Sequence, residues 1–284
     1  MRIDLHLHTN ASDGQHTPTE LIDLVRQQHL DVIAITDHDT TGGIAEAQSV
    51  SQGHPQIIPG IELSAEDEEG DVHVLGYFID PANTALQEKL SHFRTERLER
   101  GQRIVQKLID LGIPVTWDRV SAIAGDASIG RPHIARALLE AGHVDSVHDA
   151  FDRYLYNGGP AYVARYRLTP EEAIQFIHSA GGVAVLAHPG LLPDYRAMVQ
   201  RLVPAGLDGV EVYHPENSQT VRLNLSGLAQ QYDLVVTGGS DFHGQAIKAN
   251  ARPGMTDPPP ACVRALRERA ARYAGDGNSA ISNT

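Results

Sequence analysis

The chain has 284 residues, 41% of them apolar, and no apolar run approaches the roughly 20 residues that a membrane-spanning helix needs. Its formal net charge is −13, from 23 basic and 36 acidic residues, which argues against a broad binding face for duplex DNA. The single cysteine, Cys262, excludes an intrachain disulfide and a thiolate metal site, and the N-terminus lacks the pattern of a secretory signal, so we expect a cytoplasmic protein with no membrane contact and no obligate protein partner.

Seven short segments rich in Val, Ile and Leu have the composition of buried strands. They span residues 2–8, 31–36, 57–63, 72–78, 182–187, 209–213 and 234–237. Helical patterns separate most of them, and two of these helices share one start signal, with Thr17 or Thr169 as N-cap, then Pro, then Glu at the third position. Alternating strands and helices predict an α/β fold with a parallel sheet, here a closed or nearly closed β/α barrel. A doubly wound open sheet is the alternative.

The alternation stops between about residues 91 and 165, where 93–111, 131–141 and 146–155 have helical patterns and no strong strand signal occurs. We interpret 91–165 as an inserted helical substrate-binding domain, and 1–90 with 166–274 as the barrel. The insertion holds ten basic and nine acidic residues, so the basic charge is concentrated there. The polar segment 275–284 is expected to be a disordered tail without a role.

The first strand ends in two histidines, His6 and His8, which lie two residues apart and therefore share one face of the strand. Asp13 follows closely. Five of the other six strands end in or lead into the same kinds of residue, in chain order His38, Glu62, His73, His188, Asp241 and His243. Because function in a parallel barrel lies at the carboxyl ends of the strands, these nine side chains are expected to converge. They exceed what one ion needs and predict two or three ions, with Glu62 as the bridging carboxylate.

These residues resemble the pattern of the PHP superfamily, named for polymerase and histidinol phosphatase domains: His6-Leu7-His8, Asp13, Thr36-Asp37-His38, Glu62, His73, His188 and Asp241-Phe242-His243. All nine positions are filled without substitution. The resemblance implies a distorted seven-stranded β/α barrel and three ions. One would be held by His6, His8, Glu62 and Asp241, a second by Glu62, His73 and His188, and a third by Asp13, His38 and His243. Manganese is the ion that the family suggests, although the ligands would also accept zinc or iron.

For such a site we expect phosphate ester hydrolysis by in-line attack of a metal-bridging hydroxide, with inversion at phosphorus. Asp13, His38 and His243 are the predicted catalytic residues, and His243 or a water would protonate the leaving alkoxide. An amidohydrolase barrel is an alternative, because it also begins with His-x-His. Its commonest form needs a strand-end lysine, and none of Lys89, Lys107 and Lys248 ends a predicted strand.

Substrate specificity is assigned to the insertion. Arg131 and His133 belong to an Ile-Gly-Arg-Pro-His motif in which Gly130 allows close backbone approach and the guanidinium can hold a phosphate through two hydrogen bonds. Arg97 and Arg100 lie nearly on one helical face and are further substrate-binding candidates. Arg103 lies on the same face and is interpreted as a solvated partner of nearby glutamates.

The run from Gly130 to Arg136 within a helical insertion is similar to nucleotide-acting PHP proteins, notably 3',5'-nucleotide bisphosphatases. This resemblance implies hydrolysis of the 3'-phosphate of a nucleoside 3',5'-bisphosphate to the 5'-monophosphate. Alternatives are a 5'-to-3' exoribonuclease acting on short RNA, a histidinol-phosphate-type phosphatase and a non-catalytic metal-binding module. A small nucleotide or short oligonucleotide is thus the expected partner.

Eight histidines belong neither to the nine ligand positions nor to the motif of the insertion that contains His133. His214 follows the sixth strand, and the sequence leaves open whether it supports the site or has no role there. The remaining seven are interpreted as surface residues: His16, His29, His54, His92, His143, His148 and His178.

Overall fold

The computed structural model describes residues 1–67, 70–125, 129–164, 168–247 and 250–273, so the predicted tail 275–284 lies outside the described residues. The chain forms two compact units. One combines Met1–Gln87 with Leu168–Thr284, and the other is Glu88–Arg167. The assignment of 91–165 to substrate binding stays a prediction. Within the described ranges, no helix is both long and apolar enough to cross a membrane.

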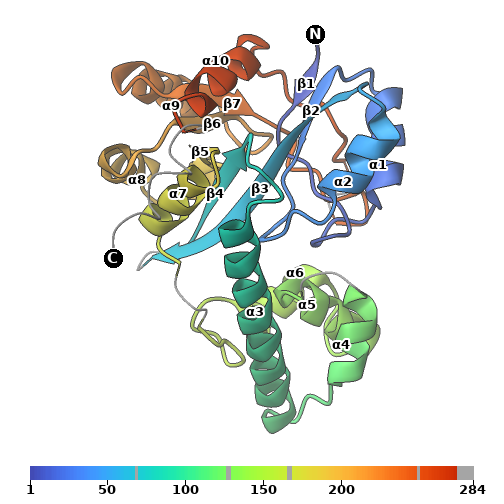
Figure 1. Cartoon of the computed structure of the whole chain (residues 1–284). Coiled ribbons are helices and arrows are strands. Elements are labelled where there is room, and N and C mark those ends of the chain that lie inside the picture. The colour runs from blue at the N-terminus through green and yellow to red at the C-terminus, as the bar shows by residue number, and fades with distance from the viewer. Residues whose placement is uncertain (68–69, 126–128, 165–167, 248–249, 274–284) are drawn as a thin grey trace, which may run out of the picture. The chain divides into compact units, whose positions relative to one another are not determined.

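The first unit is built on one seven-stranded sheet in which the strands lie side by side in chain order (Figure 1). The strands are β1 (Ile3–Asp4), β2 (Val32–Ile35), β3 (Gln56–Asp67), β4 (Gly70–Tyr77), β5 (Val183–Leu186), β6 (Gly209–Tyr213) and β7 (Val235–Gly238). All seven fall on the predicted segments. The expectation of a nearly closed α/β barrel is confirmed.

The prediction of a purely parallel sheet is wrong at β4, which runs antiparallel to both β3 and β5. No helix separates β3 from β4, and the two pair as a long hairpin in which Asp67 lies opposite Gly70. Glu62 is therefore in the middle of β3, and His73 is in the first half of β4, instead of at strand ends. The reversal compensates for this, because the beginning of an antiparallel strand lies at the same end of the barrel as the carboxyl ends of its neighbours.

The barrel closes between β1 and β7. Leu5 N donates to Gly238 O at 3.2 Å, and further along Leu7 forms a parallel bridge with Phe242. Gly239 permits this approach, because a Cβ there would lie 2.4 Å from the backbone nitrogen of His6. The two ends of the sheet therefore meet along a seam, the β1–β7 seam, formed by residues 5–8 and 238–242.

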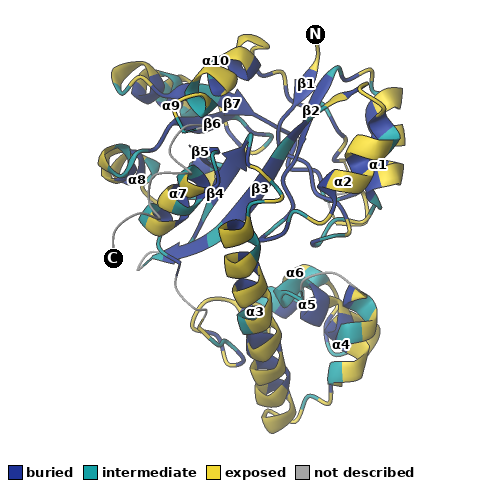
Figure 2. Ribbon diagram, viewed as in Figure 1, coloured by how far each residue is buried: buried dark blue, intermediate teal, exposed yellow. Residues whose placement is uncertain are grey.

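Helices α1 (Pro18–Gln27) and α7 (Pro170–Ser179) begin as predicted. The Thr17 hydroxyl accepts from Glu20 N and the Glu20 carboxylate accepts from Thr17 N, and Thr169 with Glu172 repeats this capping box. The other helices of this unit are α2 (Ile44–Ser51), α8 (Tyr195–Leu202), α9 (Gln219–Gln231), α10 (Ala261–Ala270) and the short 3-10 turns Pro189–Leu191 and Val203–Ala205. Figure 2 shows buried strands between helices whose outer faces are exposed.

The core of the barrel is closed at one end by α10. Its Cys262 and Leu266 pack in one buried cluster with Ile3, Val32 and Val183, which are the first residues of β1, β2 and β5. The amino-terminal ends of the parallel strands are thus sealed with apolar side chains. Any polar site in the barrel must lie at the opposite end.

The second unit is helical, and its described residues contain no strand. It holds most of α3 (Thr84–Asp110), then α4 (Trp117–Ala124), α5 (Arg131–Glu140), α6 (Val147–Ala150) and a π-helical turn, Phe151–Leu155. The sequence analysis did not assign α4, although Thr116 caps it by accepting from Arg119 N. Ile104, Leu108, Ile134 and Leu138 form the centre of a separate apolar core.

Candidate metal centre

The carboxylate of Glu62 is fully buried and surrounded by imidazoles. Its Oε2 lies 3.2 Å from Nε2 of His6 and of His8, and 3.3 Å from Nδ1 of His38. Its Oε1 lies 2.9 Å from Nδ1 of His73 and 3.1 Å from Nε2 of His188. One carboxylate with ring nitrogens on both oxygens has the arrangement that a ligand shared between ions requires.

Asp241 faces the same two histidines from the other side of the β1–β7 seam. Its Oδ1 lies 3.4 Å from His6 Nε2 and 3.3 Å from His8 Nε2. Four side chains, His6, His8, Glu62 and Asp241, offer donor atoms that all lie within 4.8 Å of one another, and all four are buried. The structure therefore brings together the set of residues predicted for the first ion.

A second group is formed by His8, Asp13, His38 and His243, whose donor atoms also lie within 4.8 Å of one another. Asp13 Oδ1 is 3.3 Å from His243 Nε2, and Asp13 Oδ2 is 3.9 Å from His38 Nε2. This group contains the three residues predicted for the third ion. The donor atoms of a further group, His38, Glu62 and His73, also lie within 4.8 Å of one another, so His38 belongs to two of the groups.

The chemistry of these donors fits divalent ions. Within the described residues, both ring nitrogens of His8, Asp13 Oδ1 and His38 Nδ1 are buried without a hydrogen-bond partner. Buried polar atoms of this kind are costly unless a ligand satisfies them. Burial alone would raise the pKa of Glu62, but the imidazoles around it together hold that pKa well below its usual value, so the carboxylate is charged. Nitrogen and oxygen donors in this ratio suit manganese, iron or zinc.

Several known proteins are similar to this chain over most of its length. The PHP domain family model matches residues 4–161. A 3',5'-nucleoside bisphosphate phosphatase of Chromobacterium violaceum is 36% identical over 95% of this chain and 97% of that protein.

The chain belongs to the PHP family.

Two further proteins are similar to this chain over most of its length. The 5'-3' exoribonuclease Rnm of Salmonella typhimurium is 38% identical over 84% of each chain. A solved structure from Bifidobacterium adolescentis, provisionally named a metal-dependent phosphoesterase, has a TM-score of 0.85 and 36% identity, and the match covers 94% of this chain and 96% of that one. This PHP chain is thus a metal-dependent phosphoesterase.

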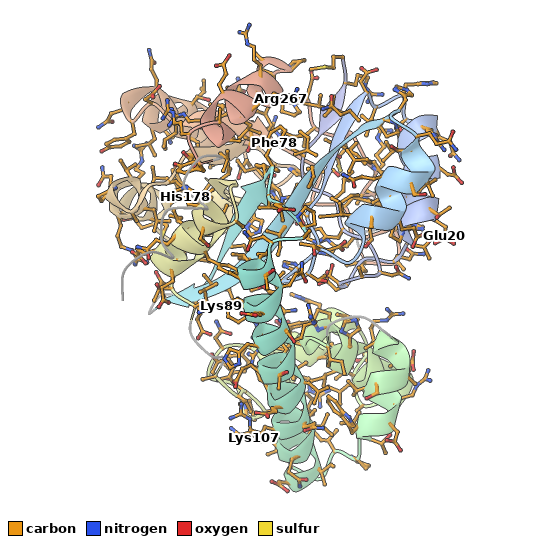
Figure 3. All side chains as sticks on the ribbon, in the orientation of Figure 1. Glu20, Phe78, Lys89, Lys107, His178 and Arg267 are labelled. Carbon is orange, nitrogen blue, oxygen red and sulfur yellow. The ribbon has the colours of Figure 1, made fainter. Side chains whose placement is uncertain are left out.

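The amidohydrolase alternative finds no support in the lysines of this PHP protein. Lys89 and Lys107 both lie on α3, as Figure 3 shows, and Lys248 lies outside the described residues. No described strand of the barrel contains a lysine. The carbamylated lysine that bridges two ions in common amidohydrolases therefore has no counterpart among the described strands.

The nine side chains of the PHP site differ in their access to solvent. Those of His6, His8 and Glu62 are at most 1% exposed and form its floor. The side chains of Asp13 and His73 are 20% exposed, that of His188 is 15% exposed, and those of His38, Asp241 and His243 are 12% exposed. Solvent reaches the site from the side of these six residues.

Two imidazoles on the open side are held in different protonation states. Burial lowers the pKa of His38 to about 3, so its ring is neutral. Burial acts in the same direction on His243, but the carboxylates of Asp13 and Asp241 outweigh it and raise the pKa of His243 to about 9. One PHP group thus contains a neutral ring beside a proton-carrying ring.

The backbone is strained at two of the predicted ligands. His188 has φ 29° and Asp241 has φ 50°, both in the left-handed region that residues other than glycine seldom adopt. Such strain is typical of sites where geometry is imposed by the surrounding fold. Asp241 directly follows Ser240, whose backbone nitrogen donates to the buried Asp4 at 2.9 Å.

Sequence reasoning missed two buried residues beside the PHP ligands, Glu211 and Asp37, and left a third, His214, open. Glu211 in β6 bonds to His6 Nδ1, and Asp37 accepts from Thr9 N and Ser12 Oγ, which shapes the turn leading to Asp13. His214, left open above, is fully buried with Nε2 3.5 Å from Asp241 Oδ2. The signal for Glu211 was a lone carboxylate within the apolar run Gly-Val-Glu-Val-Tyr, and Asp37 was passed over in favour of its neighbour His38.

Two of the predicted substrate-binding residues donate hydrogen bonds to the backbone of their own unit. Arg100 is buried, and its Nε donates to Val163 O at 2.6 Å. Arg131 donates from one terminal nitrogen to Leu155 O at 3.0 Å and to Asn157 Oδ1 at 2.8 Å. These two arginines shape the segment 155–163, and their contact with substrate stays a prediction.

The other two candidates of this unit are placed differently. His133 is buried, and its Nδ1 accepts from Gly130 N at 3.0 Å, which caps α5. Arg97 lies on α3 and is partly buried. Contact of either residue with substrate also stays a prediction.

Seven further histidines were predicted to be surface residues, and His178 differs from this prediction. His178 is only partly exposed, because its Nε2 bonds to the buried carboxylate of Asp208 at 2.8 Å and its ring stacks on Tyr273. This cluster ties α7 and the end of α10 to the sealed end of the barrel. It has a structural role remote from the ligands.

Proposed function

We propose that this PHP protein hydrolyses the 3'-phosphate of nucleoside 3',5'-bisphosphates and releases the 5'-monophosphate and inorganic phosphate. The observation that carries this substrate choice is the extent of similarity. The match with the bisphosphate phosphatase covers 95% of this chain, whereas the match with the exoribonuclease covers 84% at a similar identity.

The proposed ion ligands are His6, His8, Asp13, His38, Glu62, His73, His188, Asp241 and His243. Three divalent ions, with manganese favoured, would supply positive charge for the phosphoryl oxygens and would lower the pKa of water. The protein itself fixes where the substrate reacts, because the floor of the site is closed and its open side is bordered by Asp13, His38 and His243. Water attacks phosphorus directly in this scheme, so the configuration at phosphorus inverts.

His243 is the proposed proton donor to the leaving alkoxide. Its Nδ1 lies 3.1 Å from the carbonyl oxygen of Asp241, which can only accept, so Nδ1 carries the hydrogen of that bond. Its Nε2 lies 3.3 Å from Asp13 Oδ1, and the charge of Asp13 favours the charged form of the ring. Nε2 could either hold an ion through its lone pair or carry the proton that the alkoxide receives, but not both at once, so water near the ions is the alternative proton donor.

The test compares initial rates of the Mn²⁺-loaded protein on adenosine 3',5'-bisphosphate, adenosine 3'-monophosphate, adenosine 5'-monophosphate, histidinol phosphate and a short 5'-phosphorylated oligoribonucleotide. We expect the highest kcat/KM on the bisphosphate, with the 5'-monophosphate as product. Adenosine 3'-monophosphate is the matched control, since it has the same scissile bond and lacks only the 5'-phosphate. Equal kcat/KM on these two compounds would contradict the proposed recognition of the 5'-phosphate.

The second candidate function is 5'-to-3' exoribonuclease activity, which the similarity to Rnm favours. The same site serves both reactions, because each breaks a phosphate ester at the 3' oxygen of a nucleotide that carries a 5'-phosphate. Faster turnover of the oligoribonucleotide than of the bisphosphate, with release of mononucleotides from the 5' end, would make this the main activity.

A further inference from the structure

Glu211 is a buried carboxylate that none of the predicted ion groups includes. It lies in the middle of β6, between Val210 and Val212, and is fully inaccessible to solvent. Burying a charged carboxylate costs several kcal/mol unless its oxygens are paired with donors. The hydrogen-bond partners of Glu211 therefore indicate its role.

The first partner of Glu211 is the ring of His6. Nδ1 of His6 lies 3.1 Å from one carboxylate oxygen and 3.2 Å from the other. Because a charged carboxylate only accepts hydrogen bonds, the ring hydrogen must be on Nδ1 when His6 is neutral. The lone pair of Nε2 is then directed at the space between Glu62 Oε2, at 3.2 Å, and Asp241 Oδ1, at 3.4 Å.

The second partner is the backbone of His188, whose nitrogen donates to Glu211 Oε2 at 2.8 Å. His188 has the strained φ of 29°, and this short hydrogen bond contributes to holding it there. Its side chain then reaches Glu62 Oε1 with Nε2 at 3.1 Å. One carboxylate in β6 thus fixes a histidine that follows β1 and another that follows β5.

We propose that Glu211 is a positioning residue of the metal centre, which sets the tautomer of His6 and the backbone of His188 without touching ion or substrate. Carboxylates that accept from the distal nitrogen of a metal-binding imidazole act in this way in other metal sites. The inference rests on the proposed ligand roles of His6 and His188 and is independent of the substrate.

The decisive variant is Glu211→Gln, which keeps the shape and replaces one accepting oxygen by an NH₂ group. That group cannot accept a hydrogen bond. Whichever oxygen it replaces, it places a donor beside His6 Nδ1, which lies 3.1 Å from one oxygen and 3.2 Å from the other. Asp208→Asn is a matched control. Asp208 is also buried, precedes the same strand, and accepts from His178 Nε2 at 2.8 Å and from Ala184 N at 3.0 Å, but it lies at the sealed end of the barrel.

The measurement is titration of each metal-free protein with Mn²⁺ alone, following free Mn²⁺ by electron paramagnetic resonance. We expect the tightest Kd of Glu211→Gln to rise by about 10- to 100-fold, the usual effect of losing such a supporting group. Asp208→Asn should keep the wild-type Kd for Mn²⁺, even if its melting temperature falls as far as that of Glu211→Gln. At saturating Mn²⁺ the KM of Glu211→Gln should equal that of wild type, because substrate does not reach Glu211.

Each contrary result has a distinct meaning. Equal Kd values for wild type and Glu211→Gln, or an equal loss in Asp208→Asn, would overturn the role of Glu211. Absence of Mn²⁺ binding by the wild-type protein would instead contradict the proposed metal centre itself, and with it the role of Glu211. Should Glu211→Gln fail to fold, Glu211→Asp retains the charge on a side chain one methylene shorter, which cannot keep both contacts. A wild-type Kd in that variant would likewise overturn the proposal.

Discussion

The two units of the molecule use charged side chains in opposite ways. In the barrel, five imidazoles surround one carboxylate, and several of their nitrogens are buried without a hydrogen-bond partner in the described part of the chain. In the helical unit, Arg100, Lys107 and Arg131 donate to the backbone carbonyls of Val163, Tyr162 and Leu155. The first arrangement is suited to receiving ions, and the second to shaping a segment of the chain. Changes in the barrel should therefore act on the chemical step, and changes in the helical unit on binding.

Removal of divalent ions is the strongest test of this contrast. Treatment with a chelator should abolish phosphate release completely, and Mn²⁺ should restore it. The ions should also stabilise the fold, by about 2.7 kcal/mol when present at a hundred times their Kd, which scanning calorimetry would detect as a higher melting temperature. Full activity of a protein shown by elemental analysis to be free of metal would contradict the chemical role of the barrel.

Replacement of the central carboxylate is the next largest expected effect. Glu62→Gln should lower kcat by more than about 100-fold, because the loss of a ligand exceeds the loss of a supporting group. Elemental analysis should show fewer ions per chain. The control is Glu66→Gln in the same strand, another buried glutamate, which belongs to none of the ion groups. The same loss of kcat in both variants would argue for disruption of β3 instead.

Arg131→Ala tests the helical unit. If Arg131 and the segment that it holds bind the substrate, KM should rise about ten-fold, or roughly 1.4 kcal/mol of binding free energy, while kcat changes little. Arg119→Ala is the control, since Arg119 lies in the same unit and pairs with the exposed Glu140. A fall in kcat at constant KM would assign Arg131 to the chemical step and erase the contrast between the units.

The smallest expected effect concerns the independence of the two units. Thr17 and Thr116 cap helices in different units in the same way, each accepting from the backbone nitrogen three residues on. Thr17→Ala and Thr116→Ala should each cost about 1 kcal/mol. Hydrogen exchange measured by mass spectrometry should then speed up in α1 for the first variant and in α4 for the second. Faster exchange of both helices in either variant would show that the units open together.

The site could be predicted from the sequence because its residues are marked locally. His6 and His8 end an apolar segment, His188 directly follows another, and Asp241 comes after the last one and three small residues. The positions of these ligands therefore depend only on where strands stop. The capping boxes at Thr17 and Thr169 were equally local, since three neighbouring residues define them. Patterns of this kind need no knowledge of which strand lies beside which.

Features that depend on pairing between distant segments were not accessible. The reversed direction of β4 follows from the hairpin with β3, and an apolar segment has the same composition in either direction. Glu211 has a role only because β6 brings it beside the ring of His6 from β1. The bonds of Arg131 to Leu155 and Asn157 likewise become visible only in the folded unit.

The β1–β7 seam gives the metal centre a consequence for folding kinetics. His6 and His8 lie on one side of this seam, near the start of the chain, and Asp241 lies on the other, near the end of the barrel. An ion held by all three would cross-link two segments separated by most of the sequence, and a clip across so long a loop removes much of the entropy of the unfolded chain. Bound ions should therefore slow the release of the first strand, and the metal-free protein should unfold from its two ends inward.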